Sequence, residues 1–368
     1  MSKGIICGDM IEVLPTLPEN HFDGCLTDPP YHFTSVVKRF GKEGSAPTKS
    51  DGAYGRASTG FMGQSWDGGD IAFRPETWAK VLRVLKPGAH LAAFGAPKNV
   101  HRLTCAIEDA GFEIRDVVFW CFGTGFPKSH NGKGEAKGFG TAFKPAYEPI
   151  IVARKPLIGT IEKNFEKFGT GYLNIDAGRV LTEDNLNGGV YSKERKPSAS
   201  ELVKHGGTIH NSTGLDYKQP EGRWPANIMH DGGDEVLAAF PHTKSGKPSG
   251  VKAGNNNKVF GQYGGGIPVT GFGDEGSAAR FFYCAKATKT DREEGNNHPT
   301  VKPTDLMKWL CRVIVPPGGH VIDPFSGSGS TGKAALQDGF RFTGIEKSDV
   351  YAAIAKARIE ASIPEYLQ

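Results

Sequence analysis

Two short segments near opposite ends of the chain carry residue types that could do chemistry together. One is the tetrapeptide Asp28-Pro29-Pro30-Tyr31, and the other is the glycine-rich segment 323–332, which reads DPFSGSGSTG. Each follows a short apolar run, which is typical of a buried strand that ends in a carboxylate. Two further runs end in acids, at Asp9 and Glu346. Open α/β sheets bind ligands at the carboxyl ends of their strands, so we expect all four acids at one ligand-binding edge.

The glycine-rich segment predicts a binding turn between a strand and a helix. Small residues let backbone N–H groups approach a ligand, and the N-terminus of the following helix favours negative charge. Residues 327–333 also fit the pattern G-x-x-x-x-G-K of a phosphate-binding loop, but Ala334 lacks the hydroxyl that would bind magnesium. The carboxylate of Asp323 would repel a triphosphate and would suit an ammonium group. A P-loop-like NTPase stays open as the alternative from another class of protein.

The acid Glu346 indicates what the turn binds. It ends the next strand, about 20 residues beyond the turn, where an acid usually accepts the two hydroxyls of a ribose. A ribose, a cationic amino-acid end and an adenine together describe S-adenosylmethionine. The turn, Asp323 and Glu346 therefore predict S-adenosylmethionine as the cofactor.

The tetrapeptide at Asp28 fits a transfer to the exocyclic amino group of a nucleic-acid base. Such a nitrogen is a poor nucleophile because its lone pair is delocalised into the ring. Accepting its two hydrogens with the Asp28 carboxylate and the Pro29 carbonyl would pull it toward tetrahedral geometry. The prolines hold that carbonyl rigidly, and Tyr31 offers a face for an extruded base. The alternative is structural, since Pro-Pro ends strands and Tyr31 could cover the core.

The elements that would position these residues follow from the apolar periodicity of the chain. We expect helices over 10–17, 75–85, 99–110, 233–240, 304–313, a stretch ending at 337, and 350–361. We expect strands over 4–9, 24–26, 90–94, 114–122, 149–153, 320–323 and 342–346, with shorter strand-like pieces at 171–175 and 224–229. Strands that alternate with helices in this way indicate an α/β fold.

Composition divides the chain into three parts. Residues 157–280 are rich in Gly, Asn, Ser and Lys and predict an irregular insert between two regular parts, 1–156 and 281–368. Two aperiodic loops precede the insert: we expect 32–70 to be a mobile cationic lid and 123–145 to face phosphates. The basic residues of these loops are the candidate nucleic-acid contacts, namely Lys38, Arg39, Lys128, Lys133, Lys137 and Lys144.

The bulk properties are those of a globular protein from a reducing compartment. A net charge of +4 permits a polyanionic partner without requiring one. The six cysteines include no C-x-x-C pair and mostly lie in apolar runs, so we expect core residues rather than a metal site or disulfides. No apolar stretch approaches membrane-spanning length and no signal peptide precedes the first strand, so we expect a cytoplasmic protein.

In combination these motifs resemble the β class of S-adenosylmethionine-dependent DNA amino-methyltransferases, of the phage and restriction-modification type. In that family the Asp-Pro-Pro-Tyr segment precedes the target-recognition region and the Phe-x-Gly-x-Gly turn comes last. The same order holds here, where the first segment begins at Asp28 and the turn begins at Phe325. The resemblance covers about 1–156 and 281–368. It implies an α/β fold with a circularly permuted Rossmann-like methyltransferase core and an inserted, irregular target-recognition domain at 157–280.

The resemblance also implies roles for individual residues. Asp28, Pro29, Pro30 and Tyr31 would form the catalytic segment. Asp9 would meet the amino group of the cofactor adenine, and Thr331 would cap the helix after the turn. The segment 298–303 resembles the part of the family that closes over the methionine carboxylate of the cofactor, with Thr300 and Lys302 as its contacts. The other cofactor contacts would come from this segment, the turn and the strand after it, namely His298, Asp323, Phe325, Ser326, Gly327, Gly329 and Glu346.

These inferences lead to an adenine-specific, site-specific DNA methyltransferase. It would transfer a methyl group from S-adenosylmethionine to N6 of an adenine flipped out of double-stranded DNA, with no metal. Asp28 favours adenine, because the N4-cytosine version of the family more often carries Ser at this position; that version is the first alternative. Methyltransferases of RNA or of protein amides, which commonly carry Asn there, are a second. A non-catalytic DNA-binding module is a third, and the sequence leaves open whether the protein is a homodimer.

Overall fold

The computed structural model describes residues 4–31, 70–125, 129–182, 184, 186, 221–244, 251–252, 267–268, 275–285, 291 and 301–362. By its internal contacts the chain divides into two compact units. The first comprises 1–178, 227–236 and 284–368, and the second comprises 179–226 and 237–283. None of the helices in the described ranges is both long enough and apolar enough to cross a bilayer.

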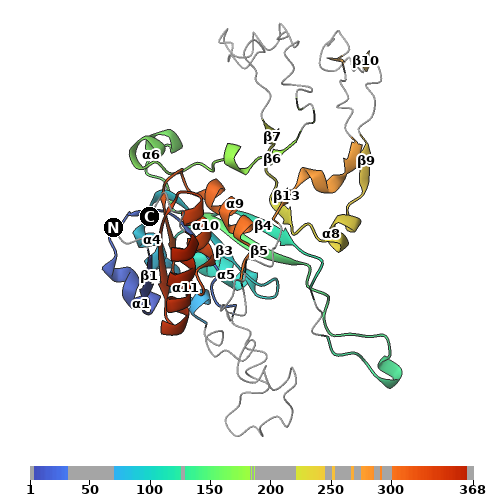
Figure 1. The fold of residues 1–368 in the computed structure, drawn as a ribbon, viewed down its shortest axis with the longest axis horizontal. Helices are drawn as coiled ribbons and strands as arrows, with labels where there is room; N and C mark the ends of the chain where they lie inside the picture. The colour runs from blue at the N-terminus through green and yellow to red at the C-terminus, as the bar shows by residue number, and fades with distance from the viewer. Residues whose placement is uncertain are drawn as a thin grey trace, which may run out of the picture. The chain divides into compact units, whose positions relative to one another are not determined.

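A nine-stranded sheet forms the centre of the fold (Figure 1), in the order β1-β15-β14-β2-β3-β5-β4-β8-β13. The strands β1, β15, β14, β2 and β3 run parallel to one another, whereas β5 is antiparallel to both β3 and β4. The structure is therefore a mixed α/β fold with a mainly parallel sheet. The strand bounds are β1 Gly4–Cys7, β2 Phe22–Thr27, β3 Leu85–Phe94, β4 Glu113–Cys121, β5 Tyr147–Arg154, β8 Ile228–His230, β13 Tyr283–Cys284, β14 His320–Asp323 and β15 Arg341–Glu346.

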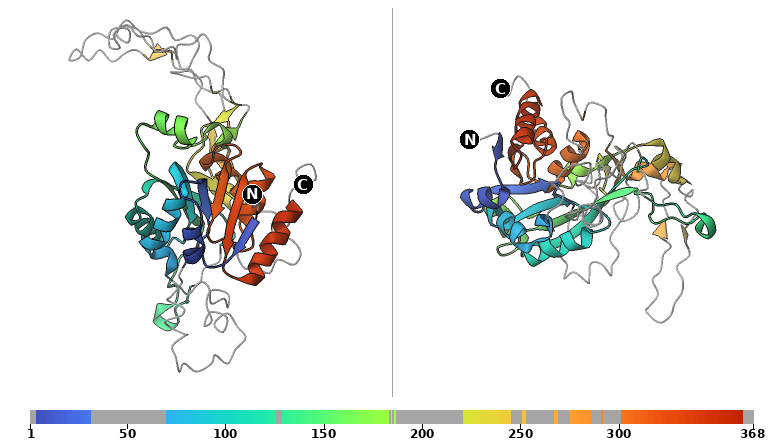
Figure 2. Two further views of the ribbon diagram at one scale, coloured as in Figure 1. Left: turned by 90° about the vertical axis from the view of Figure 1, so that its left-hand side faces the viewer. Right: turned by 90° about the horizontal axis from the view of Figure 1, so that it is seen from below.

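Helices cover both faces of this sheet, as Figure 2 shows. The helices α1, α4 and α5 pack on one face, where Trp78, Val81 and Ile107 meet strand residues such as Leu91 and Ile322 in one buried cluster. The helices α9, α10 and α11 pack against one another on the other face. The bounds are α1 Met10–Val13, α4 Pro75–Val84, α5 Val100–Asp109, α9 Thr304–Ile314, α10 Ser330–Gln337 and α11 Asp349–Ser362.

The predicted edge of acids is confirmed by the strand register. Cys7 of β1 pairs with Glu346 of β15, and Asp323 of β14 pairs with Gly344 of the same strand. Because β2 lies parallel to β14 on its other side, Asp28 leaves the sheet at the same end. A short apolar strand followed directly by a carboxylate is what places each acid there.

Several predicted elements differ from the structure for identifiable reasons. The helix expected over 10–17 ends at Val13 and continues as the 3₁₀ turn η1 Leu14–Thr16, since Pro15 lacks the backbone N–H that an α-helix requires. The strand expected at 90–94 already begins at Leu85, directly after α4. The strand-like piece at 171–175 is not a strand. The prediction of core cysteines holds for Cys25 and Cys311, whereas Cys7, Cys105 and Cys284 are exposed and Cys121 is half-buried.

The segment after residue 156 begins within the first unit. The helix α6 Ile161–Phe168 carries Asn164, whose Nδ2 donates to the carbonyl of Pro87 in β3 at 3.0 Å. Thr170 Oγ1 donates to the same carbonyl at 2.5 Å. The compact second unit begins at Arg179.

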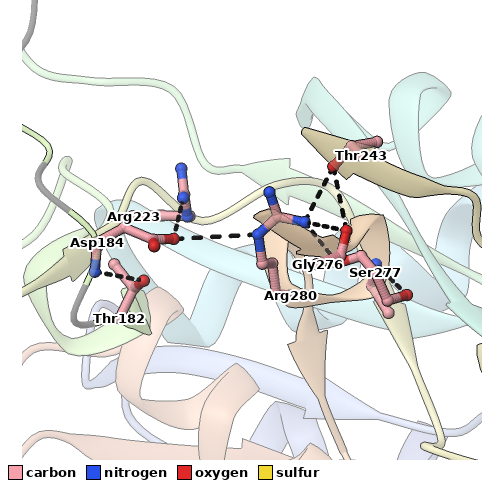
Figure 3. A network of polar contacts seen from close by, with 8 residues as sticks. Thr182, Asp184, Arg223, Thr243, Gly276, Ser277 and Arg280 are labelled. Carbon is pink, nitrogen blue, oxygen red and sulfur yellow. Dashed lines mark hydrogen bonds and ion pairs between the residues drawn. The ribbon is translucent and has the colours of Figure 1, made fainter. Parts of the chain in front are cut away.

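The second unit is held together by a network around Arg280, shown in Figure 3. Arg280 Nη1 donates to Thr243 Oγ1 at 2.9 Å and to the carbonyls of Gly276 and Ser277 at 2.6 and 2.8 Å. Its Nε lies 4.0 Å from Asp184, which also pairs with Arg223. These side-chain contacts join segments that are far apart in the sequence. The unit also contains three two-stranded pairings, namely β6 Val180–Leu181 with β7 Gly222–Arg223, β9 His242–Lys244 with β12 Glu275–Ser277, and β10 Val251–Lys252 with β11 Ile267–Pro268.

Candidate active site

Asp28 follows β2 and lies in a compact polar cluster. Tyr31 Oη donates a hydrogen bond to Asp28 Oδ1 at 2.7 Å, and Lys302 Nζ lies 3.1 Å from Asp28 Oδ2. Each oxygen of the carboxylate therefore has one fixed partner. The Asp28 side chain is 23% exposed, and a carboxylate has about four lone-pair positions, so it can still accept hydrogen bonds from a substrate.

The backbone of the tetrapeptide is held from two sides. Pro29 is buried, and its ring fixes one backbone dihedral angle. The side chain of Asn99, at the start of α5, donates a hydrogen bond to the carbonyl oxygen of Tyr31. The chain that follows β2 is thus restrained at the edge of the sheet that carries the acids, as preorganised catalysis requires.

Lys302, just before α9, is a buried cation in this cluster. Its Nζ donates to Glu148 Oε2 at 2.9 Å and to Tyr31 Oη at 3.2 Å, and lies 4.7 Å from the centre of the Phe94 ring. The residue is only 6% exposed. Burial alone would lower the pKa of this ammonium, but the charges of Asp28 and Glu148 outweigh burial and raise its pKa above the ordinary range. Lys302 therefore stays positively charged between two carboxylates.

Asp323, at the end of β14, is buried and accepts hydrogen bonds from the glycine-rich turn. Its Oδ1 accepts from Thr27 Oγ1 at 2.6 Å and from the backbone N–H of Phe325 at 3.1 Å, and its Oδ2 accepts from Thr331 Oγ1 at 2.6 Å. The residue is 2% exposed. Burial raises the pKa of Asp323 to about 6, against the three hydrogen bonds, which lower it. Most of the hydrogen-bonding capacity of this carboxylate is used inside the protein.

Thr331 does not cap the helix after the turn, contrary to the prediction. The N-cap of α10 is Gly329, which has no side chain and adopts the left-handed conformation with φ of 82°. Thr331 lies inside the first turn of the helix, and its hydroxyl is used by Asp323 instead. A buried carboxylate is a stronger acceptor partner for a hydroxyl than a neutral group, so the side chain turns inward.

Glu346, at the end of β15, contacts the turn directly. Its Oε2 accepts from the backbone N–H of Gly327 at 2.8 Å, and its Oε1 accepts from that of Ser348 at 2.8 Å. Burial raises the pKa of Glu346, while these backbone hydrogen bonds lower it. Gly327 has a φ of 51°, a conformation that favours glycine. The turn and the acid predicted to bind ribose are thus one connected structure.

Asp9 completes the row of acids but is engaged locally. Its Oδ1 accepts from the backbone N–H of Ile11, which makes Asp9 the N-cap of α1, and its Oδ2 pairs with Lys347 Nζ at 2.8 Å. The hydrogen bond from Lys347 is the main reason that the pKa of Asp9 lies below its usual value. Lys347 is 78% exposed, so this pair is screened by solvent and contributes little to stability.

The turn retains a polar atom suited to a cofactor. Ser326 Oγ is buried, and among the residues that the structure describes it has no hydrogen-bond partner. A Cβ atom at Gly344 would lie 2.6 Å from this oxygen, so glycine keeps the space around it open. Buried hydroxyls are normally hydrogen-bonded. The residues at the turn therefore fit a polar ligand such as S-adenosylmethionine, with Phe325 packed at the core beside Trp78.

The structure brings most of the predicted site residues to one edge. Lys302, predicted to contact the cofactor, lies against the tetrapeptide. Lys133, Lys137 and Lys144 lie on the loop between β4 and β5. The other predicted residues fall outside the described ranges, namely His298, Thr300, Lys38, Arg39 and Lys128, as does most of the lid expected at 32–70.

Glu148 is a site residue that sequence reasoning missed. It lies at the beginning of β5, and the carboxyl edge normally collects residues at strand ends. Because β5 runs antiparallel to β3, its first residues reach that same edge. The sequence signal was a carboxylate directly before Pro149 at a strand boundary. This signal does not show at which edge of the sheet the carboxylate lies until the direction of the strand is known.

The chain resembles known DNA methylases. The model of the N6/N4 methyltransferase family, described as DNA methylase, matches residues 22–357. The Type II methyltransferase M2.DpnII of Streptococcus pneumoniae is 34% identical over 88 residues, which are 24% of this chain and 33% of that protein. The DNA adenine methyltransferase YhdJ of Escherichia coli K12 is 39% identical over 70 residues, which are 19% of this chain and 24% of that protein. The matches thus span about a third and a quarter of these two relatives.

Among solved structures, TTHA0409 of Thermus thermophilus, complexed with S-adenosyl-L-methionine, aligns over 98% of this chain and 95% of its own, at 17% identity and a TM-score of 0.45. The match to the family model, over residues 22–357, includes both the tetrapeptide and the glycine-rich turn. The chain belongs to the N6/N4 DNA methylase family.

Proposed function

We propose that this protein transfers a methyl group from S-adenosylmethionine to N6 of an adenine that is flipped out of duplex DNA. The observation that carries the proposal is the Asp28 carboxylate, which is fixed by Tyr31 and Lys302 at the edge that also bears the glycine-rich turn. A base cannot present its amino group to such an edge while it is stacked in a duplex, so the chemistry requires extrusion.

Asp28 and Pro29 would activate the amino nitrogen. The free lone pairs of the Asp28 carboxylate would accept one N–H of the base, and the Pro29 carbonyl would accept the other, which returns the nitrogen lone pair from the ring to the nitrogen. Positive charge would develop on that nitrogen as it bonds to the methyl group and the methyl–sulfur bond breaks. The carboxylate would stabilise this charge until the nitrogen loses one of its two protons. Tyr31 would pack against the extruded base while its hydroxyl holds Asp28 in place.

The cofactor, when bound, supplies the methyl group. Ser326 and Gly327 of the turn would contact its methionine part, and Glu346 would accept the ribose hydroxyls. Asp323 would support the turn from within, because its oxygens already accept hydrogen bonds from Thr27, Phe325 and Thr331. The domain order stays part of the proposal: a circularly permuted core with target recognition in the segment inserted between 156 and 281.

Adenine is the proposed base, and N4 of cytosine is the alternative. One of the relatives named above supports adenine by its name, since YhdJ is a DNA adenine methyltransferase. The family name covers both nitrogens. Asp at position 28 is the adenine-like version of the tetrapeptide, but the physical preference is weak because both bases present the same kind of amino group.

The base identity is tested by digesting DNA methylated by the purified protein to nucleosides and separating these by mass. We expect N6-methyladenosine in its deoxy form and no N4-methylcytosine. Expression in a methylation-deficient host, followed by sequencing that reports modified bases, would give the recognition sequence. N4-methylcytosine without N6-methyladenine would overturn the adenine assignment and leave the family assignment intact.

The loop between β4 and β5 is the proposed DNA-facing arm. Figure 1 shows it extending from the sheet, with the short turn η4 Gly134–Ala136 at its tip. It is braced by its own contacts, such as the hydrogen bond from Gly132 N–H to the carbonyl of Phe139 at 2.9 Å. Phe139 and Phe143 are 72% and 97% exposed. Exposed aromatic rings among lysines suit contact with a nucleic acid.

Removing charge from this arm should weaken binding to every DNA sequence alike. In the double variant Lys133→Ala, Lys137→Ala we expect the slope of log K against log salt to fall in magnitude by about 2, because each phosphate contact contributes about 0.9. The control is Lys356→Ala, an exposed lysine of α11. Fluorescence anisotropy with labelled duplexes at several salt concentrations measures the slope. An unchanged slope in the double variant would show that the arm does not contact phosphates.

A further inference from the structure

The ammonium of Lys302 has an unusual set of neighbours for a cofactor contact. Within the described part of the chain its polar partners are Asp28, Glu148 and Tyr31, at 3.1, 2.9 and 3.2 Å. Two of these belong to the catalytic tetrapeptide and the third is the missed acid of β5. The rings of Tyr31 and Phe94 lie 5.5 and 4.7 Å from the nitrogen, within cation–π range.

The charges in this cluster do not cancel. One ammonium faces two carboxylates, both within 3.1 Å of the same nitrogen, so the cluster carries a net charge of −1 when both acids are ionised. A buried cation beside Asp28 alone would neutralise the carboxylate that stabilises charge on the amino nitrogen. Glu148 compensates that cation, and the field of Asp28 remains available to the base.

The geometry also restrains Asp28. A lone carboxylate on a short side chain rotates about its last bond, and rotation would misplace the acceptor oxygens. Tyr31 holds Oδ1 and Lys302 holds Oδ2. Lys302 can hold its position because Glu148 binds it from another strand. The restraint therefore depends on a chain of contacts that runs from β5 through Lys302 to the strand end at β2.

We propose that Lys302 and Glu148 are positioning residues for Asp28, which fix the orientation of its carboxylate and keep this cluster negatively charged during methyl transfer. The proposal rests on the proposed function of Asp28. It differs from the role that the family resemblance implies for Lys302, which is contact with the methionine carboxylate of the cofactor. The two roles make different predictions for binding and for turnover.

The test compares Lys302→Met, Glu148→Gln, the double variant and Lys302→Arg with the wild type. For each we would measure the Kd of S-adenosylmethionine by calorimetry, and kcat and its pH profile with a duplex substrate. We expect Lys302→Met to lower kcat at least 10-fold and to change the Kd less than 3-fold. Glu148→Gln should lower kcat about 3- to 10-fold, with the Kd again unchanged.

The pH profile and the double variant separate positioning from a merely structural role. The titratable groups that face the ammonium are Asp28, Tyr31 and Glu148, and the charge of Asp28 in turn raises the pKa of Asp323 at the end of the neighbouring strand. Without Lys302 the two carboxylates repel each other, so the acidic limb of the kcat profile should move to higher pH. Removing Glu148 as well should restore part of this shift and of kcat, and Lys302→Arg should retain more activity than Lys302→Met.

The outcomes are distinct. A Kd raised 10-fold or more in Lys302→Met with kcat unchanged would overturn the proposal and support the contact with the methionine carboxylate. Unchanged kcat in both single variants would also overturn it. Glu148 is more exposed than Lys302, so Glu148→Gln provides the answer if Lys302→Met does not fold, as judged by thermal unfolding. Absence of methyl transfer by the wild type itself would instead refute the proposed function.

Discussion

Replacing Asp28 by alanine is expected to lower the kcat of methyl transfer by about 100- to 1000-fold, with little change in the Kd of S-adenosylmethionine. The magnitude follows from the loss of one preorganised, charge-assisted contact that acts in the transition state. The variant removes the acceptor held by Tyr31 and Lys302, and it leaves the glycine-rich turn and Glu346 unchanged. Kinetics with a duplex substrate and calorimetric titration of the cofactor measure the two effects separately.

Two further variants serve as controls for this prediction. Asp28→Asn keeps the size of the side chain and one acceptor oxygen, so it should retain more activity than alanine while losing the charge. Tyr31→Phe removes the hydroxyl that holds Asp28 Oδ1 and keeps the aromatic face, so its effect should be smaller than that of Asp28→Ala. If Asp28→Ala turned over at the wild-type rate, the tetrapeptide would be only a strand terminator.

The second large effect is expected at Glu346, on binding rather than on the chemical step. Replacing it by alanine should weaken S-adenosylmethionine binding about 10- to 150-fold, since hydrogen bonds to a charged group contribute about 1.5–3 kcal/mol. Part of this loss would come from the turn, because Glu346 Oε2 also accepts the N–H of Gly327. Calorimetry measures the Kd, and thermal unfolding without cofactor reports whether the turn itself is destabilised.

Lys347→Ala is the matched control for Glu346→Ala. It lies at the next position and pairs with Asp9, but its side chain is 78% exposed. Exposed ion pairs contribute little, so cofactor binding should change less than 3-fold. A Kd for Glu346→Ala within 3-fold of the wild-type value would contradict the prediction that Glu346 binds the ribose of the cofactor.

The edge of the sheet was predictable because each acid follows its strand directly in the sequence. Asp323 and Glu346 end short apolar runs, and parallel strands bring such ends together whatever the details of packing. The glycine-rich turn was predictable for the same reason, since its conformation depends on local residues such as Gly327 and Gly329. Features that depend only on neighbouring residues in the sequence can be predicted without knowledge of the tertiary structure.

The contacts of Lys302 and Glu148 were not predictable from the sequence. They depend on the antiparallel direction of β5 and on how the segment before α9 packs, and neither follows from periodicity. The same limit explains Thr331, which the family resemblance assigns to the cap of α10 although a buried carboxylate from β14 accepts its hydroxyl hydrogen bond. Long-range polar partners of this kind override local preferences.

The extent of β3 shows a similar limit for secondary structure. Lys86-Pro87-Gly88 is a common helix stop, and α4 does end at Val84. The strand nevertheless runs through these residues, with Phe22 of β2 opposite Leu85 and a register shift after it. Pro87 has no backbone N–H to donate to a neighbouring strand, and its carbonyl accepts two side-chain hydrogen bonds, from Asn164 and Thr170.

The most direct test of the central claim is transfer of a radioactive methyl group from labelled S-adenosylmethionine to duplex DNA by the purified protein, with ATP hydrolysis measured in parallel. We predict label in the exocyclic amino groups of DNA bases, strong dependence on Asp28, and no ATP hydrolysis. Magnesium-dependent ATP hydrolysis with no transfer of label to DNA would contradict the account.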